Sequence, residues 1–170
     1  AYTESLVKAG DSLGEMRAAL ATRLAPVAEE AQRAIGAGEA LVLTYLPGNE
    51  KDFAMQLERV QPEDTRLRLT TVGPHRDDLR LEVRGMAAAQ FASEGQQRTA
   101  ALALKLAQAQ LFAEETGAPP LLLIDDIFGE LDAERRNALL AALPNESQKL
   151  ITATSLAWRE PKWDGPVRAL

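Results

Sequence analysis

The spacing of apolar residues predicts four helices. Apolar side chains recur every three to four residues over 11–36, and helical patterns also cover 50–60 and 95–116. From residue 100 to residue 113, the only charged side chain of the segment 95–116 is Lys105, so we expect this helix to be buried on most of its sides. A fourth helix is expected over 132–142, where Asp132 is a good N-cap.

Strand patterns of two kinds lie between these helices. Polar and apolar residues alternate over 66–72 and 78–83, which predicts two half-buried strands in a hairpin-like pair. Apolar runs predict further strands over 40–46, 120–125 and 149–154. The run over 120–125 is continuous, which is typical of a central parallel strand covered on both faces. With the helix between them, the last two strands form one βαβ unit and indicate the α/β class.

Two acidic residues stand at the carboxyl end of the strand expected over 120–125. The sequence LLLIDDIFGELD brings Asp125 and Asp126 to the strand end, where ligands collect in α/β sheets. Carboxylate oxygens suit Mg²⁺ beside phosphates, so Asp125 is a candidate metal ligand and Asp126 a candidate for polarising an attacking water. The alternative is structural, a buried strand that ends in a polar turn.

A second candidate site opens the helix expected over 95–116. The segment Ser93-Glu94-Gly95-Gln96 leaves backbone N–H groups free at a helix N-terminus, which carries partial positive charge and binds anions. The alternative is an ordinary cap, in which Ser93 is the N-cap and Gln96 completes a capping box.

The order of these features resembles that of one family of ATPases. An SxGQ signature, a long helix, an apolar strand with two acids and a Glu-Leu-Asp turn follow one another, as in the downstream half of an ABC-type ATPase head. The strings ASEGQQRTAALALKLAQAQL, PPLLLIDDIFGELDAERRNALL and VGPHRDDL are similar to the RecF family of recombination and repair ATPases. The third string is the most specific. The resemblance is strong over 66–156 and rests on the helical pattern alone over 1–65.

The resemblance implies a nucleotide site shared by two protomers, because RecF-like proteins dimerise with two ATP molecules between them. By position, Ser93, Gly95 and Gln96 would face the γ-phosphate of the ATP bound by the other protomer. Asp132 would lie in the D-loop at the dimer interface. The two strand-end aspartates would keep the roles given above, the second of them in place of the glutamate of other ABC heads.

The resemblance also implies a domain organisation, partners and a location. Residues 1–65 would be part of a helical lobe, and 66–170 the C-terminal half of the ATPase core with the signature and Walker B motifs. The protein would bind DNA at single/double-strand junctions or gaps when ATP-bound. It would load recombinase together with other recombination-mediator proteins, in the cytoplasm and away from membranes.

One family motif is missing from this sequence. It contains no G-x-x-x-x-G-K-[ST] and no Gly-Lys pair, so it lacks the backbone cradle and the lysine that hold ATP phosphates. We therefore expect this chain alone to bind ATP weakly and not to hydrolyse it. ABC transporters place a histidine after the last core strand, where this chain has Thr152-Ala153-Thr154-Ser155.

Composition narrows the remaining possibilities. The 170 residues include no cysteine, which excludes disulfides and thiolate metal sites, and no apolar run approaches the roughly 18 residues of a membrane span. A net charge of −6 argues against a simple electrostatic grip on DNA. The five arginines over 66–84 indicate either a solvated strand pair or a phosphate-facing patch. His75 is either a turn residue or a contact to nucleotide, DNA or the second protomer, and Trp158 and Trp163 fit packing better than base stacking.

Two other hypotheses stay open. An SMC-like or other ABC-type head would share the signature and Walker B motifs, but not the VGPHRDDL string. A non-enzymatic interaction domain would keep the fold and lose nucleotide chemistry, which the presence of both candidate sites disfavours.

Overall fold

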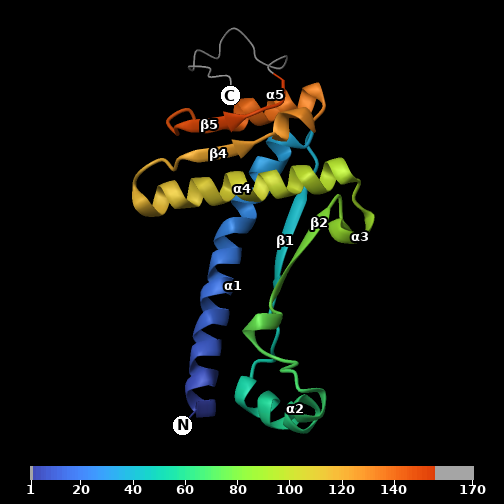
Figure 1. Ribbon diagram of the computed structural model, residues 1–170, viewed down its shortest axis with the longest axis vertical. Coiled ribbons are helices and arrows are strands. Elements are labelled where there is room, and N and C mark those ends of the chain that lie inside the picture. The colour runs from blue at the N-terminus through green and yellow to red at the C-terminus, as the bar shows by residue number, and fades with distance from the viewer. Residues whose placement is uncertain (1, 156–170) are drawn as a thin grey trace.

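The structure, a computed structural model, describes residues 2–155, with the backbone alone for Tyr2. The expectation for Trp158 and Trp163 lies outside these residues. Figure 1 shows an elongated molecule. At one end lies an α/β unit made of α4, β4, α5 and β5, and α2 lies at the other end. α1 and a β-ribbon, formed by β1, β2 and β3, connect the two ends. In chain order, the elements are α1 (Tyr2–Ile35), β1 (Leu41–Leu46), α2 (Phe53–Leu67), η1 (Pro74–Arg76), β2 (Asp78–Val83), β3 (Met86–Ala87), α3 (Ala88–Phe91), α4 (Glu94–Thr116), β4 (Leu122–Asp125), η2 (Ile127–Gly129), α5 (Ala133–Ala142) and β5 (Lys149–Thr152).

The β-ribbon pairs different strands from those that the sequence pattern predicts. β1 is antiparallel to β2, from Leu41 opposite Val83 to Leu46 opposite Asp78, and β3 adds a short third strand. The predicted strand over 66–72 and its hairpin with β2 are therefore wrong. The division into 1–65 and 66–170 stays a prediction, although β1 and β2 pair across it.

Side-chain hydrogen bonds explain why residues 68 to 72 form no strand. α2 continues to Leu67, and the backbone N–H and hydroxyl of Thr71 both donate to Asp64 Oδ1, at 3.1 and 2.6 Å, which ties this segment back to the helix. Leu67 and Leu69 are both exposed, so the alternating pattern does not mark one buried face. An alternation of polar and apolar residues favours a strand only where the apolar residues are buried on one face.

The α/β unit follows the predicted βαβ order. β4 and β5 are parallel, with Leu122 opposite Lys149 and Asp125 opposite Thr152, and α5 lies between them in the chain. Within the described residues β4 pairs with β5 alone, and Leu123 is 70% exposed. The expectation of a central strand covered on both faces is thus wrong for this chain, because one face and one edge of β4 have no neighbour here.

The hydrophobic core lies where the C-terminal part of α1 meets α4 and α5. Ala28 and Ile35 of α1 are buried there, as are Ala103 and Ala107 of α4. These alanines recur every three to four residues on one side of α4, so the two helices approach each other closely where they cross (Figure 1). This packing fixes the N-terminus of α4 relative to the strands that carry the candidate aspartates.

Candidate functional site

The parallel pairing of β4 and β5 holds both candidate aspartates against β5. The Thr152 hydroxyl donates a hydrogen bond to Asp125 Oδ1. The backbone N–H of Asp126 donates to Thr152 O and to Thr152 Oγ1, at 3.1 Å each. One threonine therefore fixes the carboxylate of the first acid and the backbone of the second.

The backbone of Asp126 is left-handed, with φ at 44°. A non-glycine residue in this region costs on the order of 1 kcal/mol and marks functional sites more often than chance. Its exposed carboxylate is nevertheless well held, because Oδ1 accepts hydrogen bonds from Thr154 N at 3.1 Å and from Thr154 Oγ1 at 3.3 Å. The strand end thus presents a fixed carboxylate to solvent.

This strand end has the donor set that Mg²⁺ prefers. The exposed carboxylate of Asp125 and the hydroxyl of Thr152 are hard oxygen donors. Among residues 2–155, no three or more histidine, cysteine, aspartate or glutamate side chains are grouped to hold a metal ion. The site therefore fits a cation shared between one or two carboxylates and a bound phosphate, rather than one caged by the protein.

The second candidate site is a capped helix N-terminus. Ser93 Oγ accepts from Gln96 N at 3.3 Å, and Gln96 Oε1 accepts from Ser93 N at 2.9 Å, which completes a capping box. The capping interpretation is thus confirmed. It leaves anion binding open, because the N–H groups of Glu94 and Gly95 take no part in the box.

The start of α5 lies beside the start of α4. Asp132 caps α5 by accepting from Arg135 N at 2.8 Å, and its carboxylate pairs with the Arg135 guanidinium at 3.3 Å. A Cβ atom on Gly95 would lie 2.8 Å from Arg135 Nη1, and Arg98 pairs with Glu130 at 3.3 Å. These contacts bring the predicted D-loop residue to the signature segment.

The six predicted site residues therefore form two clusters on one side of the α/β unit. Figure 1 shows that the carboxyl ends of β4 and β5 lie toward the same side as the N-terminus of α4. Arg135 was not among the predicted site residues, although its spacing of three from Asp132 is a signal for such a pair. Glu39 was not among them either, and it accepts a hydrogen bond from Gln96 Nε2 at 2.8 Å.

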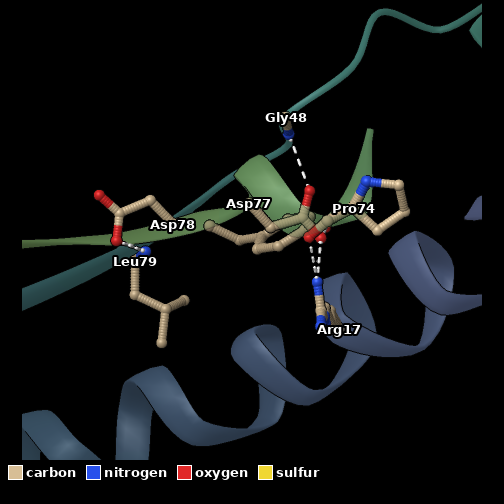
Figure 2. Close-up of polar contacts among 7 residues, drawn as sticks. Arg17, Gly48, Pro74, Asp77, Asp78 and Leu79 are labelled. Atoms are coloured by element: carbon tan, nitrogen blue, oxygen red, sulfur yellow. Dashed lines mark hydrogen bonds and ion pairs between the residues drawn. The ribbon is translucent and has the colours of Figure 1, made fainter. Parts of the chain in front are cut away.

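The VGPHRDDL string forms a polar node away from both clusters. Figure 2 shows Asp77 between α1 and the chain that follows β1. Its Oδ2 accepts from Arg17 Nη1 at 2.7 Å and from the Tyr45 hydroxyl at 2.7 Å, and its Oδ1 accepts from Gly48 N at 2.8 Å. Arg17 also donates to Pro74 O at 2.6 Å. The VGPHRDDL string thus ties α1 to both strands of the ribbon.

The node shifts the pKa values of its members. Burial alone would raise the pKa of Asp77, but hydrogen bonds from Tyr45, Gly48 and Arg17, together with the guanidinium charge, outweigh burial and lower it. Burial, followed by the hydrogen bond to Asp77 and its negative charge, raises the pKa of Tyr45 from 10.0 to about 12. Both shifts favour an ionised Asp77 beside a neutral tyrosine.

Three of the five arginines over 66–84 form ion pairs with glutamates. Arg66 pairs with Glu63, Arg80 with Glu82 at 3.2 Å and Arg84 with Glu39 at 3.8 Å. These three arginines belong to different parts of the chain, and their ion pairs favour the solvated interpretation for them over a phosphate-facing surface. The ring of His75 is hydrogen-bonded, with Nε2 2.9 Å from Thr70 O, as a turn residue would be.

Comparisons with known proteins place the chain. No family model matches it. A protein of Symbiobacterium thermophilum called DNA replication and repair protein RecF is 44% identical over 168 residues, covering 91% of this chain and 45% of the relative. The protein of the same name from Crocosphaera subtropica is 37% identical over 173 residues, covering 95% and 46%. The chain thus spans about half the length of the curated relatives it matches.

Solved structures agree with these relatives. The chain superposes on the recombination mediator protein RecF with ATP, in the RecFOR pathway, with a TM-score of 0.76 and 28% identity over 91% of this chain and 44% of that one. A second RecF structure, with ATPrS, gives a TM-score of 0.79 and 30% identity over 94% and 45%. Among residues 2–155, no helix is long and apolar enough to cross a membrane. By sequence and by fold, the chain belongs to the RecF family and corresponds to the C-terminal part of its relatives.

Proposed function

We propose that this chain is the C-terminal part of a DNA-repair ATPase that binds Mg²⁺-ATP between two protomers and acts on DNA gaps or junctions. The observation that carries the proposal is the Asp125-Asp126 pair, held at the end of β4 by Thr152 and Thr154. The relatives named for DNA replication and repair, and the RecF structure with ATP, support it.

The strand-end acids would divide the chemistry between them. Asp125, with the Thr152 hydroxyl beside it, would hold Mg²⁺, which supplies charge neutralisation at the phosphates when bound. Thr154 engages Oδ1 of Asp126, which leaves Oδ2 to accept a hydrogen bond from the attacking water. The water would thereby be oriented toward the γ-phosphate.

The capped start of α4 would act on the ATP of the other protomer. Ser93, Gly95 and Gln96 would face that γ-phosphate with the positive end of the helix dipole. Asp132, beside Gly95 through Arg135, would lie at the dimer interface. The site would be complete only in a dimer, so hydrolysis would depend on protein concentration.

DNA binding would belong to the assembled protein rather than to this chain. A net charge of −6, and the ion pairs that Arg66, Arg80 and Arg84 form with glutamates, do not favour DNA binding by this chain alone. DNA contact would therefore require the ATP-bound dimer and the other half of each protomer. Other recombination-mediator proteins would act as partners in loading recombinase.

The test uses a chimera in which this chain replaces the matching C-terminal part of the Symbiobacterium thermophilum relative. ATP hydrolysis is measured with and without gapped DNA. We expect slow, DNA-responsive turnover that falls by about a hundredfold or more in Asp126→Asn, because the water loses its general base. Asp52→Asn is the matched control, since Asp52 caps α2 far from the strand end and asparagine caps equally well.

Two outcomes would contradict the proposal. Unchanged turnover in Asp126→Asn would remove the role of this acid. A folded chimera that binds no ATP and hydrolyses none would favour the non-enzymatic interaction domain.

A further inference from the structure

A carboxylate from the junction between α1 and β1 lies against the first turn of α4. Glu39 stands in the turn that ends α1, where its backbone N–H donates to Gly36 O at 3.1 Å. Its side chain is only 17% exposed. Through this turn, Glu39 connects the base of the long α1 arm with the signature segment.

The contacts of Glu39 are selective. Its Oε1 accepts a hydrogen bond from Gln96 Nε2 at 2.8 Å, whereas the Arg84 guanidinium remains 3.8 Å away and is largely exposed. Its Oε2 is buried and has no hydrogen-bond partner. A half-buried carboxylate with one weak ion pair and one buried, unpaired oxygen does not maximise stability, so its presence calls for another explanation.

The hydrogen bond to Glu39 fixes the orientation of the Gln96 amide. The capping box already directs Gln96 Oε1 to the Ser93 N–H, at 2.9 Å. With Nε2 held by Glu39, both ends of the amide group are engaged. The second Nε2 hydrogen then has a defined direction, and Ser93 and Gly95 are held with it at the start of the helix.

The same turn receives a contact from the ribbon. Arg84 N donates to Ala40 O at 3.2 Å, so the end of β2 is bonded to the residue next to Glu39. The α1–β1 turn, the end of β2 and the signature turn therefore meet at one carboxylate. A displacement of the arm would reach Gln96 through Glu39.

We propose that Glu39 is a positioning residue for Gln96. Through Glu39, the C-terminal end of α1 sets the geometry of the signature segment, Ser93-Glu94-Gly95-Gln96. The proposal rests on the function proposed above, in which Gln96 faces the γ-phosphate of the other protomer. It assigns Glu39 the part of a hydrogen-bond acceptor, which a neutral amide of the same shape would also fulfil.

The experiment compares Glu39→Ala and Glu39→Gln in the chimera. We expect Glu39→Ala to lower kcat about five- to tenfold, the effect of losing one orienting hydrogen bond, and Glu39→Gln to stay within about twofold. ATP binding by the separate protomers at low concentration should stay within about twofold in both variants, because the phosphate loop lies in the other half. Glu30→Ala, an exposed acid on α1, is the matched control.

A second measurement needs no catalysis. In the 170-residue chain itself, the Gln96 side-chain amide is followed by NMR. We expect its protons to shift toward free-amide values and to exchange faster in Glu39→Ala, and to keep their positions in Glu39→Gln.

The outcomes separate this proposal from the wider one. Loss of turnover in Asp126→Asn with no difference between Glu39→Ala and Glu30→Ala would overturn the role of Glu39 alone. So would a Glu39→Gln variant as impaired as Glu39→Ala, a fall in ATP binding equal to the fall in kcat, or an unchanged Gln96 amide signal. Retained turnover in Asp126→Asn would instead contradict the proposed function.

Discussion

Asp77 shows what one buried side chain of the VGPHRDDL string does in the fold. Its side chain is 5% exposed and accepts hydrogen bonds from Arg17 in α1 and from Tyr45 and Gly48 at the end of β1. We expect Asp77→Asn to lower the free energy of unfolding at pH 7 by about 2 kcal/mol, because charge-assisted hydrogen bonds are lost at a buried site. Urea unfolding of the chain measures this change. Asp78→Asn is the control, since Asp78 is exposed and bonds only to Leu79 N.

The free energy of unfolding should depend on pH through Asp77 and Tyr45, in directions that their pKa shifts determine. The pKa of Asp77 is lowered from 3.8, so its contribution is present above that pH and is lost as the pH falls through the folded-state pKa. Tyr45, with its pKa raised to about 12, contributes fully below pH 10 and loses its contribution as the pH rises through 12. Unfolding free energies of Asp77→Asn should fall less steeply in acid than those of Asp78→Asn. Equal slopes would show that the node adds nothing.

Among the elements, the first turn of α4 allows stability and function to be tested separately, through a substitution at Gly95. At Gly95, an added Cβ would meet only the end of the flexible Arg135 side chain. We therefore expect Gly95→Ala to leave the melting temperature of the chain unchanged or slightly raised, because alanine favours a helix by about 0.5–1 kcal/mol over glycine. In the chimera it should still reduce turnover at least about tenfold, since the methyl group would block the approach of a phosphate to the helix N-terminus.

The control for this variant is a helical glycine away from the site. At Gly14 of α1, an added Cβ would meet only the Tyr45 hydroxyl, at 3.8 Å, so Gly14→Ala should keep turnover and, by the same helix preference, leave the melting temperature unchanged or slightly raised. A Gly95→Ala chimera with full turnover would show that α4 starts at a cap and nothing more.

Local patterns predicted the helices and strands of the α/β unit. α4, α5, β4 and β5 follow the expected segments because apolar spacing, Asp132 and the capping box act within a few residues. The strand predicted over 66–72 is absent because α2 continues to Leu67 and the Asp64 carboxylate holds Thr71 against the helix. Glu39 could not be predicted, since it meets Gln96 across 57 positions of sequence. Site residues that lie within one sequence segment could thus be predicted, whereas contacts between segments far apart in the sequence could not.

On the scale of the whole molecule, the sheet face that carries Asp125 is uncovered within the described residues. Leu121, Leu123 and Leu150 are 56, 70 and 62% exposed on or beside β4 and β5. A hollow of about 490 Å³ between α4 and β4 is lined by Phe112, Leu121 and Asp125 among others. These exposed apolar side chains lie beside Asp125, a candidate metal ligand. Apolar surface next to a candidate site is typical of a surface that another protein segment covers.

The activity of the isolated chain follows from this geometry. Its sequence has no phosphate-binding loop, and the open sheet face leaves Asp125 without a second wall to hold a triphosphate. We expect the purified 170-residue chain to show no ATP hydrolysis above that of its Asp126→Asn variant, under conditions in which the chimera turns over. A sensitive phosphate-release assay on both proteins, at equal concentration and with Mg²⁺, makes the comparison. Turnover by the wild-type chain that Asp126→Asn abolishes would mean that β4, β5 and α4 alone can hold the nucleotide, and that the missing loop improves the site rather than creating it.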